Sequence, residues 1–483
     1  MDAIVVGAGS AGSVVARRLV DAGAAVTLLE AGGPDVNPAI HDPARAGELW
    51  HGPEDWDHYT VPQPHAADRR LHLPRGKVLG GSHALNAMIW VRGAPADYDG
   101  WGLPGWAWSD VAPVFERIEK DLLEVVPNAP LHPIQQSIMD ACLSVGLPVN
   151  PDYNSGSLDG VSVQRITVRD GRRFTTWHAY ASPVASRMTV HTGAVVHRLR
   201  FSGSRVTGVV ASIEGSLREL MADLVVLAAG ALASPAILLR SGVGPADELA
   251  ALGIDVVADL PGVGRNLHDH LLSPVIFATD RDVSPSPGRS VTQVHWFWRS
   301  RPGLAVPDTQ PICFSVPMYE PWMSGPPTGF SLMAGMVTPA SRGSVRLAPD
   351  GSVLIDLGAL SAPADFECLV ASVEQCRAVG RAPAPAGEWG ARQLYPAPED
   401  DVREYVRRTA ITYHHQVGTC RMGTDASSVV DPELAVHGFD GLVVADASVL
   451  PRVTTGNTNA PAVLVGEQAA KFILGEVVSE KRG

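Results

Sequence analysis

A glycine-rich segment at the start of the chain has the spacing needed to hold phosphate groups. Residues 7–12 read Gly-Ala-Gly-Ser-Ala-Gly, the pattern G-x-G-x-x-G. Gly7 permits a tight turn, Gly9 lets the backbone approach a pyrophosphate, and Gly12 lets a helix pack close to a strand. The N-terminus of that helix offers free N–H groups and the positive end of its dipole to phosphates. The segment therefore predicts a dinucleotide site.

The elements around this segment suit the same chemistry. Residues 2–6 are an apolar run expected to form a strand, residues 10–22 have helical spacing, and residues 25–29 form a second apolar run. Such a strand–helix–strand unit begins a parallel sheet. Glu30 follows the second strand, where a carboxylate can hydrogen-bond a ribose hydroxyl. The pattern does not distinguish FAD from NAD, although its place at the N-terminus, before the Glu-Ala-Gly-Gly of residues 30–33, favours FAD.

The rest of the chain alternates helical and extended patterns, which predicts an α/β fold. Residues 223–228 are an apolar strand followed by a helix at 234–241. Residues 442–445 form another buried strand, and a long helix is expected at 460–474. We expect a nucleotide-binding domain made from separated segments, with a mixed second domain inserted between them. Further expectations are helices at 109–124, 134–146 and 364–379, paired strands within 190–210, antiparallel strands at 290–299 and 343–347, and loops at 34–74 and 380–387.

The composition indicates a folded protein and argues against several classes. The chain has 483 residues, of which 45% are apolar and 18% charged, which suits a large core and not a disordered chain. A net charge of −13 argues against nucleic acid and anionic membrane surfaces as partners. No targeting segment is visible, and the longest apolar stretch, residues 224–239, is too short to span a bilayer. We therefore expect a soluble, cytoplasmic protein without an integral membrane segment.

The spacing of cysteines and histidines predicts neither a disulfide framework nor a metal site. The five cysteines include no C-x-x-C pair, so we expect reduced thiols packed as small hydrophobic side chains. His268 and His270 have no third ligand at a suitable spacing, and we expect them to stabilise a turn at a domain junction.

Four further groups of segments combine glycines with polar residues in a distinctive order. The first is Pro-Arg-Gly-Lys-Val-Leu-Gly-Gly-Ser at 74–82, which leads into Asn-Ala-Met-Ile-Trp-Val-Arg-Gly at 86–93. The others are 230–235 leading into 238–245, then 262–270, and finally Tyr-His-His-Gln-Val-Gly-Thr-Cys-Arg-Met-Gly at 413–423 with 444–448 and 456–461. Together they resemble the glucose–methanol–choline (GMC) family of flavin oxidoreductases, in its choline dehydrogenase or alcohol oxidase branch. The resemblance runs from residue 2 to about residue 474.

The resemblance implies a Rossmann-like FAD-binding domain with an inserted substrate domain built on an antiparallel sheet. Residues 1–270 would be mainly FAD-binding, residues 271–429 would bind the substrate, and residues 430–483 would return to the FAD-binding domain. By position, Val196 resembles the residue whose backbone meets the adenine. The residues expected to bind FAD are Gly7, Gly9, Ser10, Ala11, Gly12, Glu30, Ala31, Trp56, Gly80, Gly81, Ser82, Asn86, Ala87, Met88, Ile89, Val196, Asp446, Ala447, Asn457 and Thr458.

Two departures from the family pattern have consequences. Some members attach FAD covalently through a histidine just before the asparagine of the second motif, and that position is Leu85 here. His83 lies nearby at a different spacing, so noncovalent FAD is expected. The segment between Asp121 and Ile134 is short for the family, which predicts an entrance that is more open or covered differently.

The resemblance also assigns the reacting residues. His415, three residues before Gly418, aligns with the catalytic histidine of the family. Its imidazole, with an unperturbed pKa of roughly 6.5, suits the removal of a hydroxyl proton near neutral pH. Asn459, seven residues before Gly466, would position the substrate oxygen, because an amide forms hydrogen bonds but cannot act as a base. The adjacent His414 is expected to be a packed residue.

The expected function is FAD-dependent oxidation of an alcohol to an aldehyde or ketone, with oxygen or a quinone-like carrier as acceptor. Two other readings stay open: a lyase on the same fold, as in hydroxynitrile lyases, and a flavin protein without catalysis. A primary alcohol on a modest ring or chain is the expected substrate. Several large side chains are expected mostly in the core, with a few lining the substrate cavity: Trp296, Phe297, Trp298, Phe314, Met318, Trp322, Met323 and Phe330.

Overall fold

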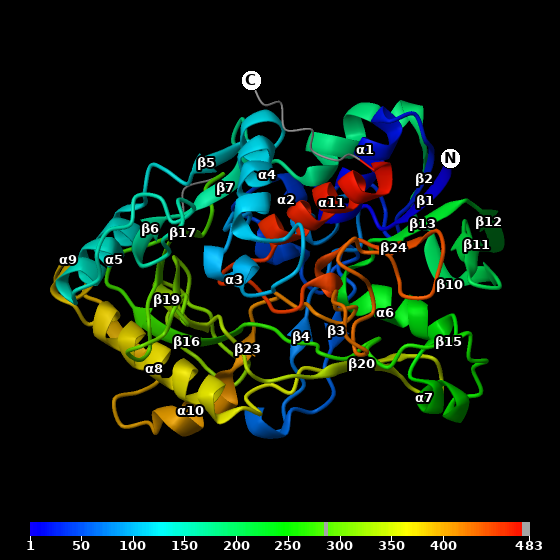
Figure 1. The fold of residues 1–483 in the computed structure, drawn as a ribbon. Helices are drawn as coiled ribbons and strands as arrows, with labels where there is room; N and C mark the ends of the chain where they lie inside the picture. The colour runs from blue at the N-terminus through cyan, green and yellow to red at the C-terminus, as the bar shows by residue number, and fades with distance from the viewer. Residues whose placement is uncertain (285–287, 476–483) are drawn as a thin grey trace.

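A parallel sheet forms one half of the molecule in the computed structural model, which describes residues 1–284 and 288–475 (Figure 1). Its strand order is β24-β13-β1-β2-β9. The predicted strand–helix–strand unit is confirmed, because α1 (Ser10–Asp21) connects β1 to β2. The strands are β1 (Asp2–Val6), β2 (Ala25–Leu29), β9 (Thr189–His191), β13 (Leu224–Leu227) and β24 (Leu442–Val444).

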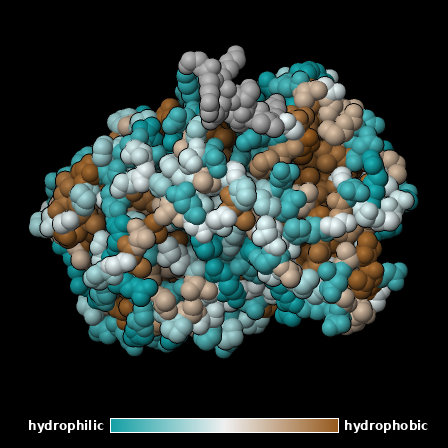
Figure 2. Space-filling view, viewed as in Figure 1, coloured by the Kyte–Doolittle hydropathy of each residue, from teal (hydrophilic) through white to brown (hydrophobic). Residues whose placement is uncertain are grey.

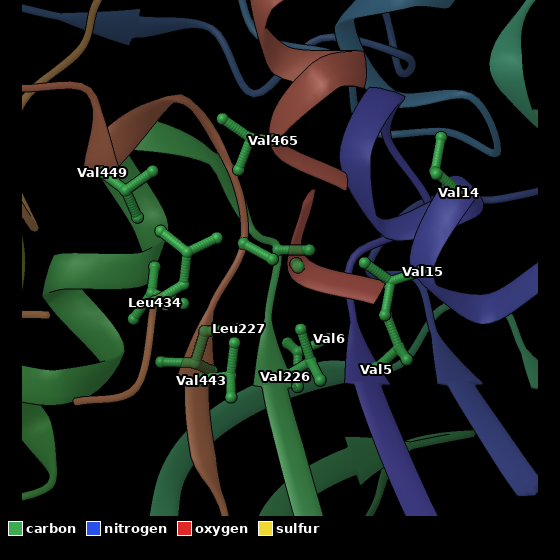
Figure 3. Close-up of a cluster of buried hydrophobic side chains, with 14 of the residues drawn as sticks. Val5, Val6, Val14, Val15, Val226, Leu227, Leu434, Val443, Val449 and Val465 are labelled. Atoms are coloured by element: carbon green, nitrogen blue, oxygen red, sulfur yellow. The ribbon is translucent and has the colours of Figure 1, made fainter. Parts of the chain in front are cut away.

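Valine and leucine side chains fill the space between this sheet and its helices. Val5 pairs with Leu28 and Val226 in register, and all three are fully buried. Val14 of α1 and Val465 of α11 (Asn459–Leu474) belong to the same buried cluster (Figure 3). A parallel sheet covered on both faces reads as continuous apolar runs, which explains why these strands were predictable.

Helices α1 and α11 lie close together at Gly466. Gly466 has no side chain, and a Cβ placed there would lie 2.7 Å from the carbonyl oxygen of Ala11 and 2.9 Å from Cβ of Val14. Only glycine fits this crossing without displacing one helix. The crossing therefore fixes the start of α1, where the glycine-rich segment lies.

An antiparallel sheet forms the other half, as the sequence predicted. Its order is β22-β16-β19-β18-β17-β6, with β23 pairing with β16. Helix α8 (Pro363–Gly380) packs against β16 and β19. The sheet contains β6 (Gly160–Val163), β16 (Leu271–Ala278), β17 (Thr292–Phe297), β18 (Ile312–Phe314), β19 (Gly329–Met336), β22 (Arg392–Tyr395) and β23 (Ile411–Thr412).

The two halves do not divide at residue 270. Strand β6 pairs with β17, and α5 (Pro133–Ser144) packs beside the same sheet, although both precede residue 270. Part of the segment expected to be mainly FAD-binding thus belongs to the second core. The end of the predicted segment 430–483, from residue 476, lies outside the described residues.

Most of the other predicted elements are present, with two differences. Residues 380–387 were expected to be a loop, but α9 (Pro383–Trp389) forms there, with proline in its first turn, where no N–H is needed. Strand β20 (Ser344–Leu347) pairs with β21 (Val353–Asp356) in a separate ribbon and not in the large sheet. The remaining helices are α2 (Pro38–His41), α3 (Pro95–Asp99), α4 (Trp108–Asp121), α6 (Gly230–Arg240), α7 (Ala246–Ala251) and α10 (Val402–Thr409). The remaining strands are β3 (His58–Tyr59), β4 (His72–Leu73), β5 (Val125–Pro127), β7 (Arg165–Arg169), β8 (Arg172–Arg173), β10 (Val195–Ser202), β11 (Arg205–Ile213), β12 (Ser216–Met221), β14 (Val243–Gly244) and β15 (Ala258–Asp259).

The face of the molecule shown in Figure 2 mixes hydrophilic residues with separate groups of hydrophobic ones. Such scattered exposure is ordinary for a folded protein. Within residues 1–284 and 288–475, no helix combines the length and hydrophobicity that crossing a bilayer requires. All five cysteines are buried with free thiols, in agreement with the predicted packing.

The close crossing of α1 and α11 gives a stability prediction. Gly466→Ala should lower the free energy of unfolding by about 1–3 kcal/mol, because the added methyl group overpacks the crossing. Gly387→Ala in α9 is the matched control: its Cβ would meet no described residue within 4 Å, so stability should stay equal or rise by up to about 1 kcal/mol. Urea unfolding followed by circular dichroism measures both variants. Equal stability of the two would contradict the role given to Gly466.

Candidate active site

A cavity of about 1040 Å³ lies between the two sheets. One side is formed where parallel strands end. Gly7 and residues 9–11 follow β1, Glu30 and Ala31 follow β2, and residues 228–233 follow β13. Asp446 and Ala447 follow β24. Ligands bind to open parallel sheets at this carboxyl edge, because the strand ends leave a crevice there. The predicted dinucleotide segment therefore faces the cavity.

The start of α1 is prepared for an anion. Its N-cap residue, Gly9, is extended, and none of the described side chains caps the helix. Gly81 approaches closely, since a Cβ there would lie 2.7 Å from the Gly9 Cα. Backbone N–H groups are therefore exposed to the cavity without side chains in the way, which suits a pyrophosphate.

Glu30 ties together two of the loops that line the cavity. Its carboxylate accepts hydrogen bonds from the backbone N–H groups of Ala8 and Gly32, both at 2.9 Å. Burial raises the pKa of Glu30 to about 7, and these N–H groups oppose the rise by favouring the ionised form. The carboxylate still lines the cavity, where a ribose was expected.

Asp446 has an equivalent position at the end of β24. Its carboxylate accepts hydrogen bonds from Gly230 N–H at 2.9 Å, from Ser234 Oγ at 2.6 Å and from Ser448 N–H at 2.8 Å. Burial raises the pKa of Asp446, and the three donors oppose that rise. The bonds hold the start of α6 beside the C-terminal segment, so segments far apart in sequence share one rim.

His415 lies at the other end of the cavity and is buried. Its backbone N–H donates to Asp269 Oδ1 at 2.8 Å, and the same carboxylate accepts from Thr412 Oγ1 and Gln416 Nε2. Asp269 thus binds three donors of one short segment. Burial raises the pKa of Asp269 to about 6, against the effect of these bonds and of nearby Arg75.

A second imidazole contacts His415 directly. His270 Nδ1 lies 2.9 Å from His415 Nδ1, and the two rings meet edge to face. The pKa of His415 is well below 6.5, mainly because burial disfavours the charged form and also because His270 is nearby. Burial lowers the pKa of His270 to about 3. His270 was expected from the sequence only to stabilise a turn, so its contact with His415 corrects that prediction.

The asparagine beside His415 is Asn457, not Asn459. Asn457 Nδ2 lies 3.2 Å from His415 Nε2. Asn459 begins α11, and its Oδ1 accepts a hydrogen bond from Ser10 Oγ at 2.6 Å, while its Nδ2 has no hydrogen-bond partner among the described residues. The expected pairing of His415 with Asn459 is therefore not formed, because Asn459 faces the glycine-rich segment.

The hydrogen bonds around Asn457 define the state of His415. Asn457 Oδ1 accepts from Gln310 Nε2 at 2.9 Å, so its amide nitrogen is the group that faces the imidazole. Because that nitrogen is a donor, Nε2 of His415 accepts. The proton of the neutral ring then lies on Nδ1, where His270 Nδ1 accepts it. This leaves the Nε2 lone pair directed towards Asn457.

The structure brings most of the predicted FAD-binding residues to the cavity. Three do not line it: Gly12 packs α1 against the turn at Gly7, while Gly80 and Met88 lie behind their neighbours. Sequence reasoning missed Arg75 and residues 229–233. The signal for the latter was available, since they follow a parallel strand. Predicted residues on the cavity wall are Gly7, Gly9, Ser10, Ala11, Glu30, Ala31, Trp56, Gly81, Ser82, Asn86, Ala87, Ile89, Val196, Asp446, Ala447, Asn457, Thr458, Asn459 and His415.

Leu85 and His83, the two residues that bear on covalent attachment of FAD, lie in different surroundings. Leu85 lines the cavity. His83 is fully buried, with Nε2 at 2.8 Å from Thr167 Oγ1 and Nδ1 accepting the N–H of Thr176 at 3.2 Å. Burial lowers the pKa of His83 to about 3. Both of its nitrogens are occupied outside the cavity.

His414 has a more exposed position than expected. It lines the cavity, and its φ is +67°. The ring of Trp50 packs edge to face with the ring of His414. His268 does stabilise a junction, because its Nε2 accepts the N–H of Val453 at 3.0 Å. Of the large side chains whose place sequence left open, Phe314 and Met318 line the cavity.

Two groups of side chains that spacing did not suggest as metal ligands come together outside the reacting end. Asp35, His41 and His178 form one group, and the other consists of His51, Asp57 and His72. Within each group the possible ligand atoms lie within 4.8 Å of one another. In the second, His51 Nδ1 lies 2.7 Å from Asp57 Oδ1.

Comparison with known proteins gives a consistent result. The family model for the N-terminal domain of GMC oxidoreductases matches residues 1–272, and the C-terminal model matches residues 339–466. An uncharacterized GMC-type oxidoreductase of Mycobacterium tuberculosis is 37% identical, with 98% of this chain and 99% of that protein covered. Pyridoxine 4-oxidase of Microbacterium luteolum is 35% identical over 96% of this chain and 98% of its own length.

Two further matches extend the comparison. Oxygen-dependent choline dehydrogenase of Sinorhizobium fredii is 33% identical, with 98% of this chain and 96% of that protein covered. Among solved structures, pyridoxine 4-oxidase from Mesorbium loti superposes with a TM-score of 0.94 at 34% identity, covering 99% of both chains. The fold therefore follows an arrangement already seen in a solved structure.

Proposed function

The chain belongs to the GMC oxidoreductase family, whose members depend on FAD, and we propose that it oxidises an alcohol to an aldehyde or ketone. The observation that carries this proposal is a neutral, buried imidazole, that of His415, at one end of a cavity whose other end suits a dinucleotide. Oxygen or a quinone-like carrier would take up the electrons afterwards.

The residues present fit FAD. The uncapped start of α1 and the close approach of Gly81 to Gly9 leave backbone N–H groups for the pyrophosphate. Glu30 lies where a ribose hydroxyl would donate to it, and Asp446 lies on the opposite rim. When bound, FAD would supply the acceptor for the hydride that leaves the alcohol carbon.

His415 would take the hydroxyl proton. Its Nε2 is the acceptor in the hydrogen-bond pattern described above, and its Nδ1 proton is held by His270. A base that is neutral before reaction can accept the proton as the carbon–hydrogen bond breaks. His270 acts through His415 and is a positioning residue, because it fixes both the ring orientation and the tautomer.

Asn457 is the better candidate for holding the substrate oxygen, in place of Asn459. Its amide nitrogen already lies 3.2 Å from the Nε2 atom that would meet the hydroxyl. A hydroxyl that lies beside both atoms could donate to Nε2 of His415 and accept from Nδ2 of Asn457, in place of the hydrogen bond that the two side chains now share. Asn459 bonds to Ser10 and would instead support the loop that holds the cofactor.

The proposal is tested by titrating the oxidised flavin anaerobically with a panel of alcohols. At least one alcohol should bleach the visible bands, and His415→Gln should slow the reduction about 10²–10⁴-fold while flavin stays bound. Rapid return of the bands in air would indicate an oxidase, and slow return would indicate a dehydrogenase that uses another acceptor. A flavin-loaded protein that no alcohol reduces would favour the lyase reading instead.

The two asparagines give a second prediction. Asn457→Ala should lower kcat/KM for flavin reduction about 10–100-fold, as expected for the loss of one hydrogen bond to the reacting oxygen. Asn459→Ala, the matched control on the same segment, should change kcat/KM by less than about threefold and act mainly on FAD affinity. Stopped-flow reduction and FAD titration separate the two effects. The reverse order would restore the original assignment to Asn459.

The pH dependence of reduction follows from the low pKa of His415. The base works when it is unprotonated, and burial keeps its pKa below 6.5. Acidification through pH 6.5 should therefore leave kcat/KM nearly unchanged, with the acid limb appearing only at lower pH. The profile is measured by anaerobic stopped flow, with flavin retention checked at each pH. An acid limb at or above pH 6.5 would contradict a buried neutral base.

We expect FAD to be held without a covalent bond. Leu85 offers no nucleophile to the cavity, and the two ring nitrogens of His83 are directed elsewhere. Precipitation with trichloroacetic acid should release all the yellow colour into the supernatant. Leu85→His provides the comparison, since it places an imidazole at the position used by covalent members. Flavin that remains in the wild-type pellet would disprove noncovalent binding.

A further inference from the structure

We propose that the substrate is an uncharged alcohol with an apolar alkyl or aryl body, and that alcohols bearing a quaternary ammonium group are excluded. This inference rests on the proposed function, because it concerns the same site. It is carried by the side chains that the antiparallel sheet presents to the cavity. The proposal distinguishes between relatives, since one is named for choline, which is a cation, and another for pyridoxine.

One face of the antiparallel sheet forms an apolar wall beside His415. Ile312 of β18 pairs with Met333 of β19, and Leu272 of β16 pairs with Ile411 of β23. These four residues line the cavity and, with Tyr413, belong to one packed cluster. We call this face the substrate wall. Three of the strands that contribute to it, β16, β19 and β23, pair with one another through β16 and can be followed in Figure 1.

Further apolar side chains extend the substrate wall towards the outside. Phe314, two residues after Ile312, lies on the same face of β18. Met318 follows on a loop, is half-buried, and packs with the same cluster. Val291 and Val316 also line the cavity. A substrate that reaches His415 along this wall is therefore in contact with hydrocarbon on that side.

No described residue of the substrate wall has a carboxylate. Among the described residues that line it, the carboxylates are Glu30, Glu48 and Asp446. Glu30 and Asp446 follow strands of the parallel sheet and accept backbone N–H groups, and Glu48 forms a two-bond pair with Arg45. A cation at the substrate wall would lose its hydration without gaining a counter-charge, which is unfavourable.

Aromatic rings do not replace the missing carboxylate. Tyr413 is the aromatic residue nearest the base, and its ring stacks on His415 with centroids 4.6 Å apart and planes 21° apart. One face of that ring is thus covered by an imidazole. Recognition of a quaternary ammonium group uses several open ring faces around the cation. Among the described residues of the substrate wall, only Phe314 offers one, since Trp50 and Trp56 line the cavity from outside the antiparallel sheet.

The few polar groups near the substrate wall match a single hydroxyl. His415 and Asn457 provide one acceptor and one donor at the reacting point. The phenol of Tyr413 donates to the carbonyl of Gln310 at 3.3 Å. Arg75, the nearest cationic side chain, donates to the carbonyls of Pro74 and His414, both at 2.6 Å. The polar groups therefore lie at the His415 end, where His414 and Gln416 also line the cavity, and the antiparallel-sheet face beside them is apolar.

A pair of isosteric alcohols tests the inference on the flavin-loaded protein. Choline and 3,3-dimethylbutan-1-ol have the same shape, but a neutral carbon replaces the quaternary nitrogen in the second. The neutral alcohol should reduce the flavin with a kcat/KM at least about 100-fold higher, because the cation finds no partner. Benzyl alcohol should likewise exceed 4-(hydroxymethyl)benzoate. A preference for choline or for the benzoate would overturn the inference while leaving alcohol oxidation intact.

A charge introduced on the substrate wall gives an independent check. Met318→Glu places a carboxylate at a half-buried loop position where folding is at little risk, and it should raise the choline to dimethylbutanol ratio at least about tenfold. Met221→Glu, at a side chain that is 62% exposed on β12, is the control and should leave the ratio unchanged. Equal ratios in all three proteins would count against the substrate wall as the determinant.

Failure of the proposed function can be told apart from failure of this inference. If none of the alcohols reduces the flavin, alcohol oxidation is disproved. The relative affinity of the protein for the two isosteres then still tests whether the site prefers an uncharged ligand. Binding is read from the shift of the flavin absorption bands as each isostere is added. A shift at lower concentrations of the neutral isostere supports an uncharged ligand, and a shift at lower concentrations of choline overturns it.

Discussion

The arrangement of the reacting end of the cavity depends on the hydrogen bonds that the buried carboxylate of Asp269 accepts. It binds the backbone N–H of His415 and the side chains of Thr412 and Gln416. Thr412 pairs with the antiparallel sheet through β16, while Gly418 donates to Ala447 on the parallel-sheet side. A single anion therefore fixes the strand connection that places the imidazole between the two sheets.

Burial determines the chemistry of the imidazole held there. Desolvation is the main reason that the pKa of His415 is low, and His270, His414 and Arg75 each disfavour a positive charge on the ring as well. A neutral imidazole carries its proton on only one of its two nitrogens. In His415 that nitrogen is Nδ1, which donates to Nδ1 of His270. The combination of desolvation and a fixed tautomer explains how an ordinary histidine can be a base whose Nε2 atom is unprotonated.

The two sheets give the cavity two different chemical characters. Parallel strands all end at the same edge, so their N–H groups and the carboxylates of Glu30 and Asp446 collect on one side. The antiparallel sheet presents alternate side chains, and the face that reaches the cavity is apolar. A charged, extended cofactor suits the first side and an uncharged alcohol suits the second. The position of His415 at the junction brings the two together.

Local sequence determined the parts of this protein that depend on neighbours along the chain. The fingerprint at residues 7–12, its flanking strands and Glu30 lie within about thirty residues, and their apolar runs and glycine spacing suffice to place them. The long helices at 363–380 and 459–474 were predictable for the same reason. The order of motifs identified the family, and with it His415.

Only the tertiary structure decided what surrounds His415. His270 lies 145 residues away in sequence and Asn457 lies 42 away, and no local pattern states that either contacts the ring. The choice between Asn457 and Asn459 depends on where the segment turns into α11, since one faces the imidazole and the other faces Ser10. Likewise, period-two alternation shows that a strand has two faces, but packing against α8 on one side decides which face lines the cavity. These features depend on contacts between distant segments, which is why they could not be derived from the sequence by itself.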